Sequence, residues 1–160
     1  MSMSGKHHRG GVSVGVLRNV DMWEAELIIN LRLWCSGLSG RAHVYDAYST
    51  RLASSSASQE FEIFERLLNS ISTYAHRPLV HHDVECSCIG ADEQILAHLV
   101  ATASSGDLRD ASLIATLLAG AAQAEHIALL AAQVGHTSKR MALSRPQMNA
   151  SAPGPSYQLH

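Results

Sequence analysis

The stretch FEIFERLLNSISTYA, residues 61–75, decides the fold class of this chain. Its apolar residues recur at steps of three and four, with charged and polar residues between them. This is the pattern of an amphipathic helix with one face against a core. Pro78 is expected to end the helix, because proline lacks a backbone N–H and disfavours helical geometry at the preceding residue.

Similar patterns before this stretch predict two more helices. The first begins at Asp21, which forms a predicted capping box with Glu24, and ends at Gly37 in a left-handed conformation. The second covers residues 41–53. The serine-rich run 54–58 is expected to end it, because serine side chains compete for backbone hydrogen bonds.

After the stretch, the pattern predicts three further helices. One follows Gly90, a second is capped by Asp107 and ends near Gly120, and a third ends at Gly135. A short seventh helix over residues 138–144 also fits the pattern.

These elements predict an all-α fold, an irregular bundle of about six helices. Residues 21–144 are expected to form a single helical domain between a flexible N-terminal tail, 1–20, and a disordered C-terminal tail, 145–160. The valines of residues 12–16 alternate with small residues and also fit a short edge strand, but the glycine content favours a tail.

Composition limits the classes of partner. The chain has 160 residues, of which 46% are hydrophobic and only 16% charged, and its formal net charge is −2. Nucleic-acid binding is not expected, because it draws on clustered lysine and arginine. A sparsely charged, alanine-rich surface suits close helix packing, so we predict a protein partner or a homodimer formed through a helix face.

Hydropathy and cysteine content predict the cellular setting. No run approaches the roughly 18 apolar residues that a membrane span needs, so no membrane association is expected. The cysteines number three, an odd count, which disfavours a disulfide framework. We therefore predict a cytoplasmic protein with reduced thiols.

The segment HHDVECSC, residues 81–88, concentrates the metal-type ligands of the chain. Imidazole and thiolate are the preferred ligands of Zn²⁺, which takes four of them in a tetrahedron. His82, Cys86 and Cys88 are the candidate ligands from this segment, and Cys35 is the predicted fourth. Such a closed site would hold structure rather than catalyse.

Other interpretations of the same segment stay open. His81, His76 and His43 are reserve metal ligands. Cysteine also packs as a small hydrophobic residue, which needs no metal at all. Cys86 and Cys88 are a third alternative as a redox pair, although one intervening residue places them poorly for a disulfide.

An enzymatic alternative uses the same segment differently. His81, His82 and either Asp83 or Glu85 would hold a catalytic ion with a bound water. A catalytic site has three protein ligands and an open position, whereas a structural site has four ligands and none open. No catalytic base is evident, so we favour a non-enzymatic helical module, with zinc as the candidate cofactor and a regulatory or protein-interaction role.

Two acidic residues, Asp92 and Glu93, follow Gly90 at the expected start of a helix. Their predicted role is to stabilise the helix dipole, because negative charge is favourable near a helix N-terminus.

Several positions before, within and after the segment 81–88 form one pattern. They are Arg77, Pro78, Leu79, His82, Cys86, Cys88, Gly90, Asp92 and Glu93. This pattern resembles a stretch found in a family of small, uncharacterised helical bacterial proteins, and the similarity extends to about Met141. His81 lies outside the shared pattern. The resemblance implies a bacterial cytoplasmic protein and implies no activity.

Overall fold

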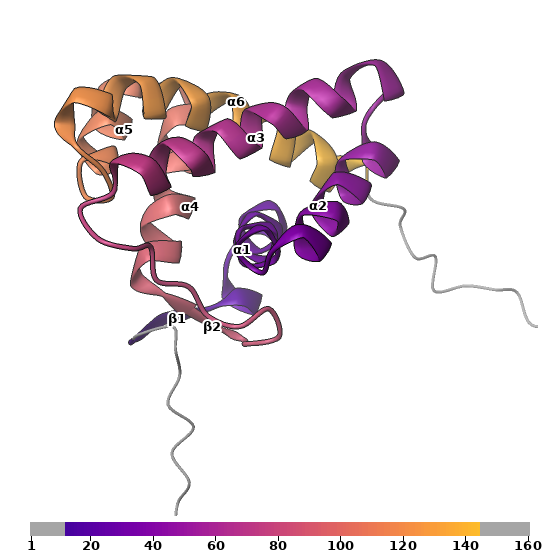
Figure 1. Cartoon of the computed structure of the whole chain (residues 1–160), viewed down its shortest axis with the longest axis horizontal. Coiled ribbons are helices and arrows are strands. Elements are labelled where there is room, and N and C mark those ends of the chain that lie inside the picture. Colours follow the sequence, from indigo (N-terminus) through magenta and orange to yellow (C-terminus); the bar gives the residue numbers. More distant parts are fainter. Residues whose placement is uncertain (1–11, 145–160) are drawn as a thin grey trace, which may run out of the picture.

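Helices make up most of the computed structural model, which describes residues 12–144 (Figure 1). Its elements in chain order are β1 (Ser13–Val16), the short 3-10 helix η1 (Leu17–Asn19), α1 (Met22–Cys35), α2 (Leu38–Arg51), α3 (Ser54–Tyr74), β2 (Cys88–Gly90), α4 (Ala91–Ser104), α5 (Leu108–Ala115), the 3-10 helix η2 (Ala121–Gln123) and α6 (Ala124–Leu143). The predicted bundle of about six helices is confirmed. In the described part of the chain, no helix is long and apolar enough to cross a membrane.

Helix α6 packs against α1, α3, α4 and α5. Its contact with α4 is close at Gly135, where an added Cβ would lie 2.5 Å from the Cβ of Ser104. Gly135 was predicted to end a helix, and that prediction is wrong, because this glycine lies inside α6 and allows the two helices to approach. The predicted short helix 138–144 is the continuation of α6.

Two of the helix boundaries differ from those predicted. The run 54–58 begins α3 instead of ending α2. Backbone N–H groups in the first turn of a helix have no intrahelical partner, so the competition that weakens serine inside a helix does not apply there. Asp21 precedes α1 as predicted, but its side chain makes no capping hydrogen bond, so the capping box is wrong.

Two other predicted boundaries are confirmed. Gly37 separates α1 from α2, as expected for a glycine stop, and its φ of +106° is one that favours glycine. Asp107 caps α5, since its Oδ1 accepts a hydrogen bond of 3.1 Å from the backbone N–H of Asp110.

The predicted tail 1–20 is wrong for residues 13–19. Strand β1 pairs antiparallel with β2, with Val16 opposite Cys88, and the N–H of Leu17 donates to the carbonyl of Ser87. The alternating valines therefore do form a strand, because the loop before α4 offers an extended partner. Residues 1–11 and the predicted tail 145–160 lie outside the described residues.

Candidate functional site

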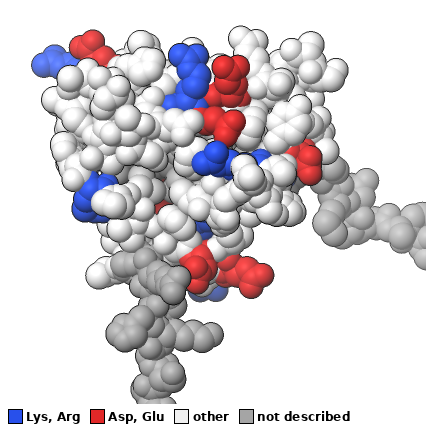
Figure 2. Space-filling model, in the orientation of Figure 1, with Lys and Arg blue, Asp and Glu red and all other residues white. Residues whose placement is uncertain are grey.

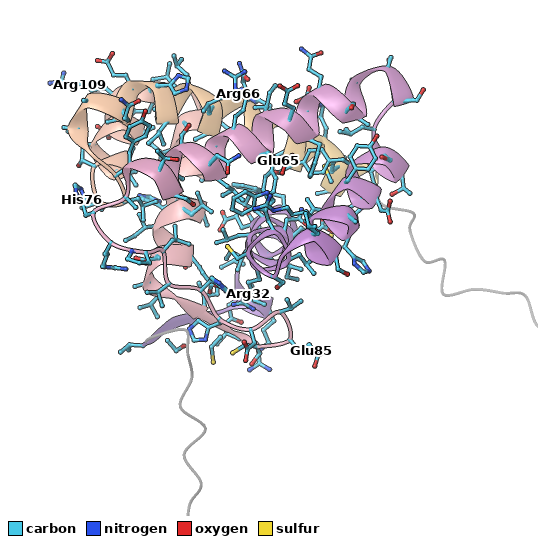
Figure 3. All side chains as sticks on the ribbon, viewed as in Figure 1. Arg32, Glu65, Arg66, His76, Glu85 and Arg109 are labelled. Atoms are coloured by element: carbon cyan, nitrogen blue, oxygen red, sulfur yellow. The ribbon has the colours of Figure 1, made fainter. Side chains whose placement is uncertain are left out.

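The segment after α3 is arranged around one arginine, Arg32, in the last turn of α1. Arg32 is fully buried. Its Nη1 donates to the carbonyls of Asp83 and Cys86, at 3.2 and 2.7 Å, and its Nη2 donates to the carbonyl of Cys88 at 2.6 Å. Figure 3 shows Arg32 extending from α1 toward the loop below it, whereas Glu85 points away from the protein.

Glu93, in the first turn of α4, completes this arrangement. Its carboxylate lies against the guanidinium of Arg32, with Nε to Oε1 at 2.7 Å and Nη2 to Oε2 at 2.9 Å. The same carboxylate accepts from the backbone N–H of His82 at 3.0 Å and from that of Gly90 at 2.8 Å. We call Arg32, Glu93 and the carbonyls of Asp83, Cys86 and Cys88 the Arg32 clamp.

The Arg32 clamp is fully hydrogen-bonded. The five N–H groups of a guanidinium all find acceptors, and both oxygens of the carboxylate accept twice. Burial by itself would raise the pKa of Glu93, but the hydrogen bonds from Arg32, Gly90 and His82 outweigh burial and hold that pKa below its usual value. Both groups are therefore charged, and the ion pair positions the loop.

A second ion pair lies beside the first. Asp92 is buried and accepts from Nη1 and Nη2 of Arg77 at 2.7 and 2.8 Å, and from the N–H of Val80 at 2.8 Å. Burial favours a raised pKa for Asp92, but these hydrogen bonds prevail and lower it. Asp92 and Glu93 do lie in the first turn of α4, as expected for dipole stabilisation, and each also holds one arginine.

The end of α3 is tied to the segment after α5. Nε2 of His76 lies 3.0 Å from the carbonyl oxygen of Thr116, and Ala75 forms an isolated antiparallel bridge with Ala119. Both ends of the loop are thus held by other elements of the fold.

Of the predicted zinc ligands, the structure brings two together. Nδ1 of His82 and Sγ of Cys86 are 3.5 Å apart. Two ligands of one tetrahedral zinc ion, with bonds of about 2.1 Å to nitrogen and 2.3 Å to sulfur, would lie about 3.6 Å apart. His82 is buried, whereas Cys86 and Cys88 are half-buried.

The other predicted ligands lie elsewhere. Cys35, His76 and His81 line a different feature, an open groove of about 500 Å³ beside the end of α3. Burial raises the pKa of the Cys35 thiol, and Glu93 raises it further against the opposing effect of Arg41. His43 is exposed on α2, with its Nδ1 3.2 Å from the carbonyl oxygen of Ser39.

Within residues 12–144, no three His, Cys, Asp or Glu side chains are arranged to hold a metal ion. Asp83 and Glu85, the carboxylates of the enzymatic alternative, are both exposed. The zinc site therefore stays a prediction, for which the pair of His82 and Cys86 supplies half of a ligand set.

Arg32 was not predicted from the sequence. A signal for it does exist in the run IINLRLW, residues 28–34, where a single arginine is enclosed by apolar residues. Charged residues are almost never fully buried unless they are paired. A lone arginine in such a run therefore indicates a buried acidic partner, although the run does not say that the partner is Glu93.

An exposed apolar surface lies over α5 and α6. A groove of about 400 Å³ separates their outward faces, and we call it the leucine groove. Leu113 is 62% exposed and Leu129 is 53% exposed, while Leu117, one turn after Leu113, is 63% exposed. The residues lining the leucine groove are Leu108, Arg109, Ser112, Leu113, Glu125 and Leu129.

Comparisons of this chain with protein-family models, with curated proteins and with solved structures gave no match. The resemblance to small helical bacterial proteins accordingly stays a prediction.

Proposed function

We propose that this protein is a non-enzymatic helical interaction module whose binding face is the leucine groove. The observation that carries the proposal is the exposure of Leu113 on α5 and Leu129 on α6, which are each more than half accessible and both line this groove. Contiguous apolar patches on a folded protein mark interaction sites more often than isolated exposed residues do.

The low charge of the chain supports this role. Figure 2 shows charged side chains scattered over a face that is otherwise uncharged. Apolar helical grooves of this kind accept another helix, because apolar side chains at helical spacing fill the space between two helices. The groove is rimmed by Arg109 and Glu125, which would orient such a helix.

The loop supports an interaction role more than a catalytic one. Its two acidic residues at the start of α4 are each engaged by an arginine, so neither is presented to a substrate. The segment acts in this proposal as a rigid support. The three cysteines are free thiols, which fits the reducing cytoplasm of a bacterial cell as part of the same proposal.

The experiment is site-specific photo-crosslinking in cells that naturally make the protein. A photoreactive amino acid replaces Leu113, and in a matched control it replaces Leu38, which is 84% exposed at the start of α2. We expect a discrete protein adduct from position 113 and none from position 38. Absence of any adduct from position 113 would remove the proposal.

Structural zinc at the loop is a separate proposal, supported by the 3.5 Å approach of His82 and Cys86. Cys88 is the next ligand in this proposal, and Cys35 would need to approach from the neighbouring groove. Elemental analysis of untagged protein should give about one equivalent of zinc, and Cys86→Ser should abolish it. Zinc near zero in the wild-type protein would contradict the proposal.

A further inference from the structure

We infer that the occupant of the leucine groove is a second copy of this chain, packed about a two-fold axis that passes through the leucines. This inference rests on the interaction function proposed above and names its partner. In a two-fold dimer the same surface is used by both copies, so the surface must be complementary to itself.

The charges of the leucine groove meet that condition. Arg109 lies one helical turn before Leu113 on α5, and Glu125 lies one turn before Leu129 on α6. Among the described residues, neither Arg109 nor Glu125 forms an ion pair. Figure 3 shows Arg109 at the outer edge of the molecule.

A two-fold rotation gives each of these charges a partner. With the leucines of both copies at the centre, Arg109 of one copy faces Glu125 of the other, and the symmetry makes this contact twice. An unrelated partner would need to supply both opposite charges at the correct spacing, whereas a second copy carries them already. Opposite charges at the rim set orientation, and apolar contact at the centre supplies most of the affinity.

The first test is sedimentation velocity of the purified full chain over a range of concentrations. We expect a reversible dimer for the wild-type protein and a monomer for Leu113→Glu with Leu129→Glu, because two carboxylates from each copy, four in all, would be buried at the centre. Leu38→Glu is the matched control and should leave the dimer intact. A wild-type protein that stays monomeric at about 100 μM, where even weak specific association with Kd near 10 μM is populated, would overturn the inference.

The second test exchanges the charges. Arg109→Glu alone and Glu125→Arg alone each create two like-charge contacts and should raise the dimer Kd roughly tenfold, a loss of about 1.4 kcal/mol. The double exchange restores opposite charges and should return Kd to within about threefold of the wild-type value. A double variant as weak as the single variants would overturn the proposed arrangement.

These outcomes separate the inference from the function on which it rests. A monomeric protein that still cross-links through position 113 to a different protein would refute the dimer and leave the interaction function in place. A protein that neither dimerises nor cross-links would refute both.

Discussion

The Arg32 clamp and the leucine groove differ in whether their side chains find partners within the chain. In the Arg32 clamp, a buried guanidinium and a buried carboxylate engage each other and the surrounding backbone. In the leucine groove, Leu113 and Leu129 are left more than half exposed. The fold therefore satisfies the buried charges that hold the loop, whereas the leucines of α5 and α6 are left accessible to a partner.

Removing the centre of the Arg32 clamp should have the largest effect. Arg32→Met leaves Glu93 buried without its counter-charge and three loop carbonyls without their donor. We expect a loss of about 3–5 kcal/mol in the free energy of unfolding, measured by urea denaturation, as for a broken buried ion pair.

The double variant Arg32→Met with Glu93→Gln is the control for charge. It removes the unpaired carboxylate and should recover part of the lost stability, because an uncompensated buried charge is the main penalty. A loss below about 1 kcal/mol for Arg32→Met alone would mean that the loop is not held by this residue. Breaking an exposed ion pair already costs up to about that much stability.

Breaking the ion pair of Asp92 and Arg77 should destabilise the protein less than removing Arg32 does. Asp92→Asn keeps the shape of the side chain but removes the charge that pairs with Arg77, and we expect a loss of about 1–3 kcal/mol in the free energy of unfolding. Arg77→Lys keeps the charge on a residue whose side chain is 60% exposed, and should destabilise the protein less than Asp92→Asn does. A larger loss for Arg77→Lys than for Asp92→Asn would contradict this ranking.

Acid should lower the free energy of unfolding, because it protonates the carboxylates of Asp92 and Glu93. The pKa values of Asp92 and Glu93 are both lowered in the folded protein, so the unfolded chain takes up protons first as the pH falls. The stability that they contribute is present above their unfolded pKa values of about 3.9 and 4.3, and is lost as the pH falls through the folded values. Urea denaturation at pH 7, 5, 4 and 3 should show the decline, and Asp92→Asn should make it shallower.

The helices could be predicted from the sequence because their signal is local. The apolar spacing of residues 61–75 identifies α3, and Asp107 identifies the start of α5, since both features depend on a few neighbouring residues. Gly135 shows the limit of local signals. A glycine reads as a helix end unless the position of Ser104, on another helix, is known.

The contacts that hold the loop between α3 and α4 could not be predicted from the sequence, and the metal site expected there stays a prediction. The histidines and cysteines drew attention to this loop, in which Nδ1 of His82 lies 3.5 Å from Sγ of Cys86. What holds the loop is an arginine whose acceptors lie more than fifty residues later in the sequence. Backbone carbonyls are the main acceptors, and every residue has one, so residue types cannot reveal such a contact.

The leucine groove should respond least to substitution. Leu113→Gln should change the free energy of unfolding by no more than about 0.5 kcal/mol, since changes on the surface away from special contacts have small effects. Leu99→Ala, in the fully buried core, should lose about 2–5 kcal/mol under the same conditions. Both are measured by urea denaturation at a protein concentration below the dimer Kd, so that association does not contribute. A loss above 1 kcal/mol for Leu113→Gln would mean that this leucine stabilises the monomer, and its exposure would then no longer argue for a partner.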